Sequence, residues 1–295
     1  MKNVKNKLCL GTVQLGMTYG VKNELGRQPT QEESFAVLDT AVDSGVDVFD
    51  TAAAYGEAES LLASYGLAKR GVRIITKLPA GVPDEKDAVF SACKKSLESI
   101  GTDKLDGYLL HEAKDIYRKG IMEGLAEVKK QGLVSHVGVS IYEPEDALAA
   151  ADNDIIDYIQ VPYNVLDQRL DECDFFKKAK GRGMTVFARS AFLQGLLLMD
   201  PLKLPRGLQS AQPYIRGFGQ IAEQYGFSRL EAAFLYSYTH PGIDYVVFGV
   251  DTKEQLQDNL KLVGKANSFG ECFKKLHGAF RDVPREIIVP SLWNK

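Results

Sequence analysis

The sequence has few cysteines, no long apolar run and no cluster of basic residues. Its four cysteines, Cys9, Cys93, Cys173 and Cys272, are widely spaced and form no CxxC pair, so neither a disulfide framework nor a zinc site is expected. No stretch approaches the ~18 apolar residues of a membrane span, and the N-terminus has too little apolar length for a signal peptide. These absences predict a cytoplasmic protein with free thiols, no metal and no membrane association.

The charge balance excludes a further class of partner. Lysine and arginine number 36 against 39 aspartates and glutamates, which gives a net charge of −3 at pH 7. Without a basic cluster, this balance argues against nonspecific binding of nucleic acid. A hydrophobic content of 45% and a charged content of 25% are typical of a soluble globular protein with a sizeable core. No break in composition divides residues 1–295, so we expect a single domain.

Strand-like apolar runs alternate with helical patterns eight times along the chain. Strands are predicted at residues 7–11, 46–50, 72–77, 105–111, 134–140, 157–161, 184–189 and 243–248. Strict alternation implies parallel strands with helical crossovers. Eight units at this length predict an α/β fold, a (β/α)8 or TIM barrel, with an extra helix over 269–280 and a tail to Lys295. An open dinucleotide-binding sheet is rejected, because segment 11–16 has only two glycines, at the wrong spacing for a phosphate loop.

Four reactive side chains lie at the ends of three successive predicted strands. In VDVFDTAAAYG, the second strand ends on Asp50, and a turn of small residues can bring Tyr55 back over the strand end. Lys77 ends the third strand and His111 the fourth. Singly, each could cap a helix or lie on the rim in solvent. Because active sites of such barrels gather at this face and adjacent strands are ~4.8 Å apart, the coincidence favours one shared pocket.

Motifs along most of the chain carry a resemblance to a known family. They are GTVQLG at Gly11, FDTAAAYGEAE at Phe49, the strand ending at Lys77, LLH at His111, GLVSHVGVS at Gly132, IQVPYNVL at Ile159, RSAFLQGLL at Arg189 and FGVDTKEQLQDNL at Phe248. This set, in this order, resembles the aldo-keto reductase family in its bacterial members, from about residue 8 to residue 260. The resemblance implies an NAD(P)H-dependent enzyme that interconverts a carbonyl, either aldehyde or ketone, and an alcohol.

By this resemblance Asp50, Tyr55, Lys77 and His111 form the catalytic tetrad. A free tyrosine titrates near ~10, too high to exchange protons readily at neutral pH. The Lys77 ammonium should lower the pKa of Tyr55, the proposed general acid and base, and Asp50 should hold Lys77 charged and oriented. His111 can hydrogen-bond the carbonyl oxygen. The nicotinamide supplies the hydride, while the protein supplies positioning and electrostatics.

The resemblance also places a cofactor over the barrel mouth. The positions it implies are Gly11, Thr12, Ser140, Gln160, Arg189, Ser190, Leu193, Gln194, Gly195, Gly249, Val250, Asp251, Lys253, Gln255 and Asn259. Ser140 and Gln160 match positions that bind the nicotinamide carboxamide. The loop from Ser190 to Gly195 would cover the pyrophosphate, and the start of the helix after Gly249 suits a phosphate because helix N-termini bind anions.

Three of these positions depart from the family pattern. Ile141 stands where an asparagine usually follows the serine, so one polar contact is lost. Arg189 replaces an aromatic that stacks on the nicotinamide; its planar guanidinium either stacks in turn or points away to pair with a carboxylate. Asp251 occupies the place of a cation that binds the 2′-phosphate, although Lys253 follows closely. NADP(H) is therefore favoured, and NAD(H) or dual use stays open.

The small-molecule carbonyl substrate is less well defined. Tyr19, Tyr163, Phe192 and Trp293 are candidates to line its pocket, although ordinary packing would equally explain each. The MTYG and RSAFLQGLL segments resemble bacterial members associated with sugar and surface-polysaccharide metabolism, which suggests a sugar-like carbonyl. Two alternatives stay open: a lyase with a Schiff base on Lys77, which Asp50 disfavours by keeping the amine protonated, and a cofactor-sensing barrel with little turnover. The sequence does not define the natural substrate, the physiological direction or the oligomeric state.

Overall fold

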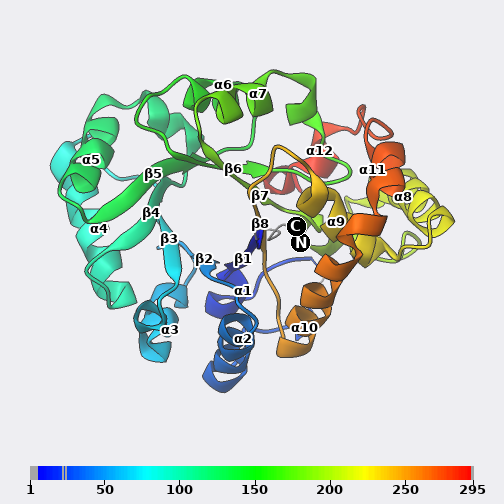
Figure 1. Cartoon of the computed structure of the whole chain (residues 1–295), viewed down its shortest axis with the longest axis horizontal. Coiled ribbons are helices and arrows are strands. Elements are labelled where there is room, and N and C mark those ends of the chain that lie inside the picture. The colour runs from blue at the N-terminus through cyan, green and yellow to red at the C-terminus, as the bar shows by residue number, and fades with distance from the viewer. Residues whose placement is uncertain (1–5, 22, 24, 294–295) are drawn as a thin grey trace.

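A computed structural model describes residues 6–21, 23 and 25–293, and its eight parallel strands close into a barrel (Figure 1). The strands are β1 (Leu8–Gly11), β2 (Val48–Asp50), β3 (Arg73–Leu78), β4 (Leu105–Leu110), β5 (Val134–Ser140), β6 (Tyr158–Pro162), β7 (Thr185–Arg189) and β8 (Tyr245–Phe248). Each strand pairs with its sequence neighbours, and β8 pairs with β1 to complete the ring. The predicted (β/α)8 fold is confirmed.

Helices surround the barrel on its outside (Figure 1). They are α1 (Val13–Gly16), α2 (Gln31–Asp43), α3 (Ala58–Tyr65), α4 (Lys86–Ile100), α5 (Lys119–Lys130), α6 (Pro144–Ala151), α7 (Phe175–Gly181), α8 (Gln212–Gln224), α9 (Arg229–Thr239), α10 (Lys253–Leu262), α11 (Gly270–Leu276) and α12 (Arg285–Ile288). Local sequence fixes several ends. Thr30 and Glu33 form a capping box at the start of α2. Helix α3 stops at Tyr65, because Gly66 adopts a left-handed conformation with φ 73°.

Alternation along the strands decides which side chains enter the barrel. The interior core consists of Cys9, Val48, Ile75, Leu109, Tyr158, Phe187, Tyr245 and Val247. Residues two positions further along the same strands face the same side, one layer nearer the C-terminal mouth. Asp50, Lys77, Gln160 and Arg189 hold such positions on β2, β3, β6 and β7. The register that fills the core therefore also places polar groups in a layer directly above it.

The C-terminal region differs from the prediction. The helix expected over 269–280 is the shorter α11, which packs with α8 and α9 on one side of the barrel (Figure 1). The chain then forms α12 and a short 3-10 helix (Pro290–Leu292). Trp293 is 7% exposed and its indole donates a hydrogen bond to the Ile287 carbonyl, so it packs into the core instead of lining a pocket. The last residues of the predicted tail, 294 and 295, lie outside the described residues. Within the described part, every helix is too short or too polar for a membrane span.

Candidate active site

Asp50 and Lys77 form a buried ion pair at the C-terminal mouth of the barrel. The Lys77 ammonium lies 2.7 and 2.8 Å from the two carboxylate oxygens of Asp50 and donates a third hydrogen bond to the Thr51 carbonyl at 2.8 Å. Gln160 donates to the same carboxylate at 2.8 Å from the other side of the barrel. All three ammonium protons thus have acceptors, which is the condition for holding a charge out of water.

Tyr55 is positioned by a close approach of two backbone segments. A Cβ on Gly16 would lie 2.0 Å from the Tyr55 carbonyl oxygen, and one on Gly56 would lie 2.3 Å from the Gly16 oxygen. Gly56 also has φ 56°, a conformation that favours glycine. Only glycines at both positions allow the loop after β2 to fold back against α1. This contact holds Tyr55 over the strand end, as the small-residue turn predicts.

The structure brings the four expected catalytic residues together. The Lys77 ammonium nitrogen is 5.0 Å from the centre of the Tyr55 ring. The His111 ring meets the Tyr55 ring edge to face, with 5.8 Å between centroids and 88° between planes. The phenol therefore lies between a buried cation and an imidazole, while the roles of the four groups stay a prediction.

Burial dominates the ionisation of these groups. It raises the pKa of Tyr55 above 10, although the Lys77 charge opposes this in the expected direction. Burial alone would lower the pKa of Lys77, but Asp50 and Tyr55 outweigh it and the net pKa is raised. Burial, followed by the Lys77 charge, lowers the pKa of His111 to about 4. At neutral pH, Lys77 is therefore charged, whereas Tyr55 and His111 are neutral.

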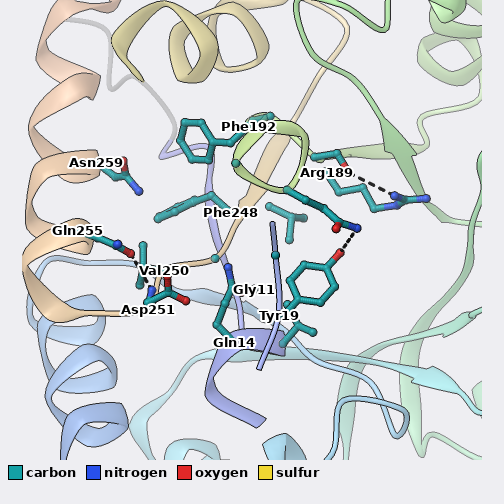
Figure 2. Close-up of a pocket in the computed structure, with 18 of the residues that line it drawn as sticks. Gly11, Gln14, Tyr19, Arg189, Phe192, Phe248, Val250, Asp251, Gln255 and Asn259 are labelled. Carbon is teal, nitrogen blue, oxygen red and sulfur yellow. Dashed lines mark hydrogen bonds between the residues drawn. The ribbon is translucent and has the colours of Figure 1, made fainter. Parts of the chain in front are cut away.

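A cavity of about 820 Å³ opens above this cluster and extends toward α10 (Figure 2). Asp50, Tyr55 and His111 line it, whereas Lys77 lies behind them with no exposed surface. The expected cofactor residues that line it are Gly11, Ser140, Gln160, Arg189, Ser190, Gln194, Gly195, Gly249, Val250, Asp251, Gln255 and Asn259. Thr12, Leu193 and Lys253 do not. The Thr12 hydroxyl is buried and donates to the Asp50 carbonyl at 3.1 Å, so it supports the site from behind.

The end of the cavity at α10 is acidic. Thr252 caps α10 through the Gln255 amide, and Asp251, Glu254 and Asp258 line the cavity around this helix start. Arg229 also lines it, but its guanidinium donates to the Leu197 and Met199 carbonyls. Figure 2 shows Asp251, Gln255 and Asn259 on one side of the cavity, opposite Tyr19 and Arg189.

Gln14 is a lining residue that sequence reasoning missed. A Cβ on Gly249 would lie 2.0 Å from its Oε1 atom, so only glycine after β8 leaves room for this side chain. Gln14 belongs to the GTVQLG motif, and its position just past β1 is the signal that could have identified it. Further lining residues that were not expected are Val13, Gly20, Tyr142, Ala191, Leu198, Ser228, Arg229, Leu230, Val247, Phe248, Thr252, Glu254 and Asp258.

The loop after β7 has an unusual backbone. Ser190, Leu193 and Gln194 have φ of 63°, 48° and 52°, a region that residues with a Cβ seldom occupy. The Gln194 side chain donates to the Tyr19 hydroxyl at 3.0 Å, and the Gln194 carbonyl accepts from the Val21 amide at 3.1 Å. These bonds connect the loops after β1 and β7 across the cavity, and they place Tyr19 in its wall.

Two candidate substrate residues take different places. Phe192, like Tyr19, lines the cavity. Tyr163 does not: it has no exposed surface, donates to Asp171 at 2.9 Å and stacks on Tyr236 with 5.5 Å between ring centroids. The expectation that Tyr163 lines the pocket is therefore wrong. It lies one residue beyond β6, on the side that faces the helices.

The aldo/keto reductase family model matches residues 7–269. The chain belongs to the aldo/keto reductase family. This match confirms the resemblance expected from the motifs, and the protein is accordingly an oxidoreductase. Aldo/keto reductases generally use NAD(P)H and act on small-molecule carbonyls.

Related proteins support this assignment. Oxidoreductase sirO of Leptosphaeria maculans is 27% identical over 294 residues, which cover 88% of each chain. Aldo-keto reductase str7 of Strobilurus tenacellus is 30% identical over 200 residues, which span 64% of this chain and 57% of that protein. The solved structure of aldo-keto reductase AKR11C1 from Bacillus halodurans, in its holo form, superposes with a TM-score of 0.74 at 20% identity over 95% of both chains. That structural likeness shows the shared barrel fold.

Proposed function

We propose that this aldo/keto reductase is an NAD(P)H-dependent enzyme that interconverts an aldehyde or ketone and the corresponding alcohol. One observation carries the proposal. The Tyr55 phenol faces the cavity with the Lys77 ammonium 5.0 Å from its ring and with His111 against its edge. A proton donor and a neutral imidazole on the cavity wall, with a fixed cation behind them, are what carbonyl reduction requires of the protein.

Each residue has a definable part in the reaction. In reduction, Tyr55 gives its proton to the oxygen of the carbonyl, and in alcohol oxidation it takes a proton back. Lys77 stabilises the phenolate left behind, and Asp50 keeps that ammonium charged and in place. Neutral His111 can donate a hydrogen bond that orients the carbonyl. The nicotinamide, when bound, supplies or accepts the hydride at carbon.

The cavity fits a dinucleotide. Gln14 and Gln194 line it, and in the described part of the chain their Oε1 atoms are buried without a hydrogen-bond partner. Buried polar atoms normally have partners, so a polar ligand in the cavity would complete both side chains. Ser140 and Gln160 line the catalytic end, and the N-terminus of α10 offers backbone amides at the other.

The acidic end of the cavity, at α10, affects whether NADP(H) or NAD(H) is the favoured cofactor. The family resemblance favours NADP(H), but three carboxylates line the cavity at the start of α10, whereas Lys253 does not line it. Carboxylates repel a 2′-phosphate and can accept hydrogen bonds from the hydroxyls of an unphosphorylated ribose. The geometry thus adds weight to NAD(H) or dual use.

Fluorescence titration with NADH and with NADPH separately tests the proposal. Asp251→Arg should raise the affinity for NADPH relative to NADH by about tenfold, because a cation would replace a carboxylate beside the phosphate. Asp103→Arg is a matched charge reversal at an exposed position just after α4, and it should leave the ratio unchanged. An unchanged ratio in Asp251→Arg would mean that Asp251 does not face the ribose. If neither cofactor binds the wild type, the proposed reductase activity is wrong.

The Schiff-base alternative loses support in this geometry. A lysine nucleophile must be deprotonated and must reach its substrate. Lys77 has no exposed surface, three hydrogen bonds to oxygen atoms and a raised pKa. Turnover of a carbonyl panel would separate the proposed reductase from the remaining alternative, a cofactor-sensing barrel.

A further inference from the structure

Arg189 brings a guanidinium to the wall of the cavity that also holds Tyr55 and His111. One nitrogen, Nη2, donates to the Ile141 carbonyl at 2.7 Å, and the guanidinium carbon lies 4.0 Å from the centre of the Tyr142 ring. The contact from Nη1 to the Ser190 hydroxyl is long, at 3.4 Å. Nε is buried and has no hydrogen-bond partner within the described chain. The group is held in place, yet part of its donor capacity is unused.

Within the described residues, the charge of Arg189 also lacks an ion-pair partner. Four carboxylates in the described part of the chain pair with other cations: Asp50 with Lys77, Asp167 with Arg169, Glu143 with Arg169 and Arg285, and Glu112 with Lys114. Among the residues that the structure describes, no carboxylate forms an ion pair with Arg189, so it does not point away to such a partner as one sequence interpretation required. A partly buried cation without a counterion attracts an anion.

The position of Arg189 links this charge to the reacting groups. It ends β7 in the polar layer that contains Asp50, Lys77 and Gln160. Its field reaches the catalytic residues: the pKa of His111 is lowered by burial and by Lys77, and Arg189 adds to that shift. With His111 neutral and Lys77 matched by Asp50, Arg189 is the net positive charge at this end of the cavity.

We propose that Arg189 binds a carboxylate on the substrate, so that the carbonyl compound is an oxo acid. The proposal rests on the carbonyl reduction proposed above and specifies the substrate class of the same site. A guanidinium offers parallel donors that match the two oxygens of a carboxylate. A single unpaired positive charge suits a carboxylate better than a phosphate dianion. A sugar acid would combine this requirement with the sugar-like carbonyl that the sequence suggests.

Matched substrates test the proposal. Each carboxybenzaldehyde differs from its carboxamide counterpart in charge but hardly in shape. The three isomers differ in the distance between the carbonyl and the carboxylate. In the wild type, kcat/KM should favour the carboxylate over the amide by about 10- to 100-fold for at least one isomer. Arg189→Met should bring this ratio close to one, and Arg189→Lys should retain part of it. Any effect of the substitution on the cofactor acts on both substrates alike, so it cancels in the carboxylate-to-amide ratio measured within one variant.

Arg70→Met is the matched control. Arg70 also stacks on a tyrosine, with its guanidinium carbon 4.6 Å from the centre of the Tyr65 ring, and it does not line the cavity. Its loss removes the same charge and the same kind of contact, so the carboxylate-to-amide ratio should stay at the wild-type value. A ratio near one in the wild type for all isomers would overturn the proposal. So would an equal loss for both substrates in Arg189→Met, since the guanidinium would then act on the cofactor.

Direct binding separates this proposal from the proposed reaction. Calorimetric titration of the wild type and Arg189→Met with benzoate and with benzamide needs no turnover. We expect benzoate to bind Arg189→Met at least about tenfold more weakly than it binds the wild type, whereas the affinity for benzamide should change little. If no carbonyl is reduced but benzoate binding depends on Arg189, the reductase proposal fails and the carboxylate site stands. Equal benzoate binding by the two proteins would overturn the carboxylate site even in an active reductase.

Discussion

Two largely buried clusters in this barrel contain the same kinds of side chain but lie in different surroundings. One, the cavity cluster, consists of Asp50, Tyr55, Lys77 and His111. The other, the outer cluster, consists of Tyr163, Asp171, Tyr236, His240 and His277 on the helical side of the barrel. Both combine a carboxylate with at least one phenol and with basic groups within hydrogen-bonding or ring-contact distance. Only the cavity cluster has members that line the cavity.

The outer cluster is closed by its own packing. The Tyr163 hydroxyl donates to Asp171 at 2.9 Å, and the His240 Nε2 lies 3.1 Å from the same carboxylate. Phe176 and Phe273 pack against the His240 ring, with centroids 4.5 and 6.1 Å away. Burial, Tyr236 and Asp171 raise the pKa of Tyr163, and among the residues that the structure describes no lysine counters them as Lys77 does at Tyr55. The comparison teaches that a cation beside the phenol and an open path, more than the residue types, distinguish a candidate reaction centre from a structural network.

Removing the two phenols should separate these roles most sharply. Tyr55→Phe removes the only proposed proton donor, so kcat/KM for carbonyl reduction should fall by about 100- to 10,000-fold. Affinity for the nicotinamide cofactor, measured by fluorescence titration, should change by less than about twofold because the hydroxyl acts on the substrate. Retained turnover would remove Tyr55 from the acid role.

Tyr163→Phe is the matched control, since it deletes a buried hydroxyl from the outer cluster. Its kcat/KM should stay near the wild-type value. The free energy of unfolding should fall by about 1–3 kcal/mol, because the Asp171 carboxylate loses a hydrogen bond inside the protein. An activity loss in Tyr163→Phe as large as in Tyr55→Phe would contradict the distinction between the clusters.

The next largest effect is expected from breaking the ion pair between Lys77 and Asp50, which should lower the free energy of unfolding. Lys77→Met leaves the Asp50 carboxylate buried without its cation, which should lower the free energy of unfolding by about 3–5 kcal/mol. Urea unfolding measures this loss. The double variant Lys77→Met/Asp50→Asn removes the stranded charge and should recover part of the stability without recovering activity. Equal stability of the single variant and the wild type would mean that the pair is more hydrated than its burial indicates.

The cavity cluster could be predicted from sequence because its positions depend on local rules. Alternation along a strand fixes which residues face the barrel: Asp50 ends β2, Lys77 is the last but one residue of β3, and His111 directly follows β4. The same alternation, applied to β6, would have placed Tyr163 with Ile159 and Val161 on the outer side, away from Gln160. The eight-strand order also followed from the chain alone, because each helix connects adjacent parallel strands.

Other features depend on contacts between distant segments. Trp293 is a candidate for the pocket on sequence alone, but its place is set by how the tail packs after α11, which no local pattern encodes. The positive φ of Leu193 and Gln194 belongs to a loop joined to Tyr19, and nothing in RSAFLQGLL marks it. The surroundings of Arg189 depend on Tyr142, on a neighbouring loop. Side-chain partners across loops therefore needed the structure.

The smallest expected effect comes from the imidazole of the cavity cluster. His111 lies beside the Lys77 cation, and burial together with that charge lowers its pKa to about 4, from 6.5 for a free histidine. Between these two pH values, the unfolded chain binds a proton that the folded protein does not, so the free energy of unfolding falls as the pH falls. His111→Gln removes this contribution. The free energy of unfolding of the variant should therefore decline less steeply as the pH falls, by up to about 1.4 kcal/mol per pH unit near pH 5. Urea unfolding of both proteins from pH 7 down to about pH 4.5 measures the difference in slope. Parallel profiles would mean that His111 takes up its proton as readily in the folded protein as in the unfolded chain, and the neutral donor proposed for the carbonyl would then be charged in weak acid.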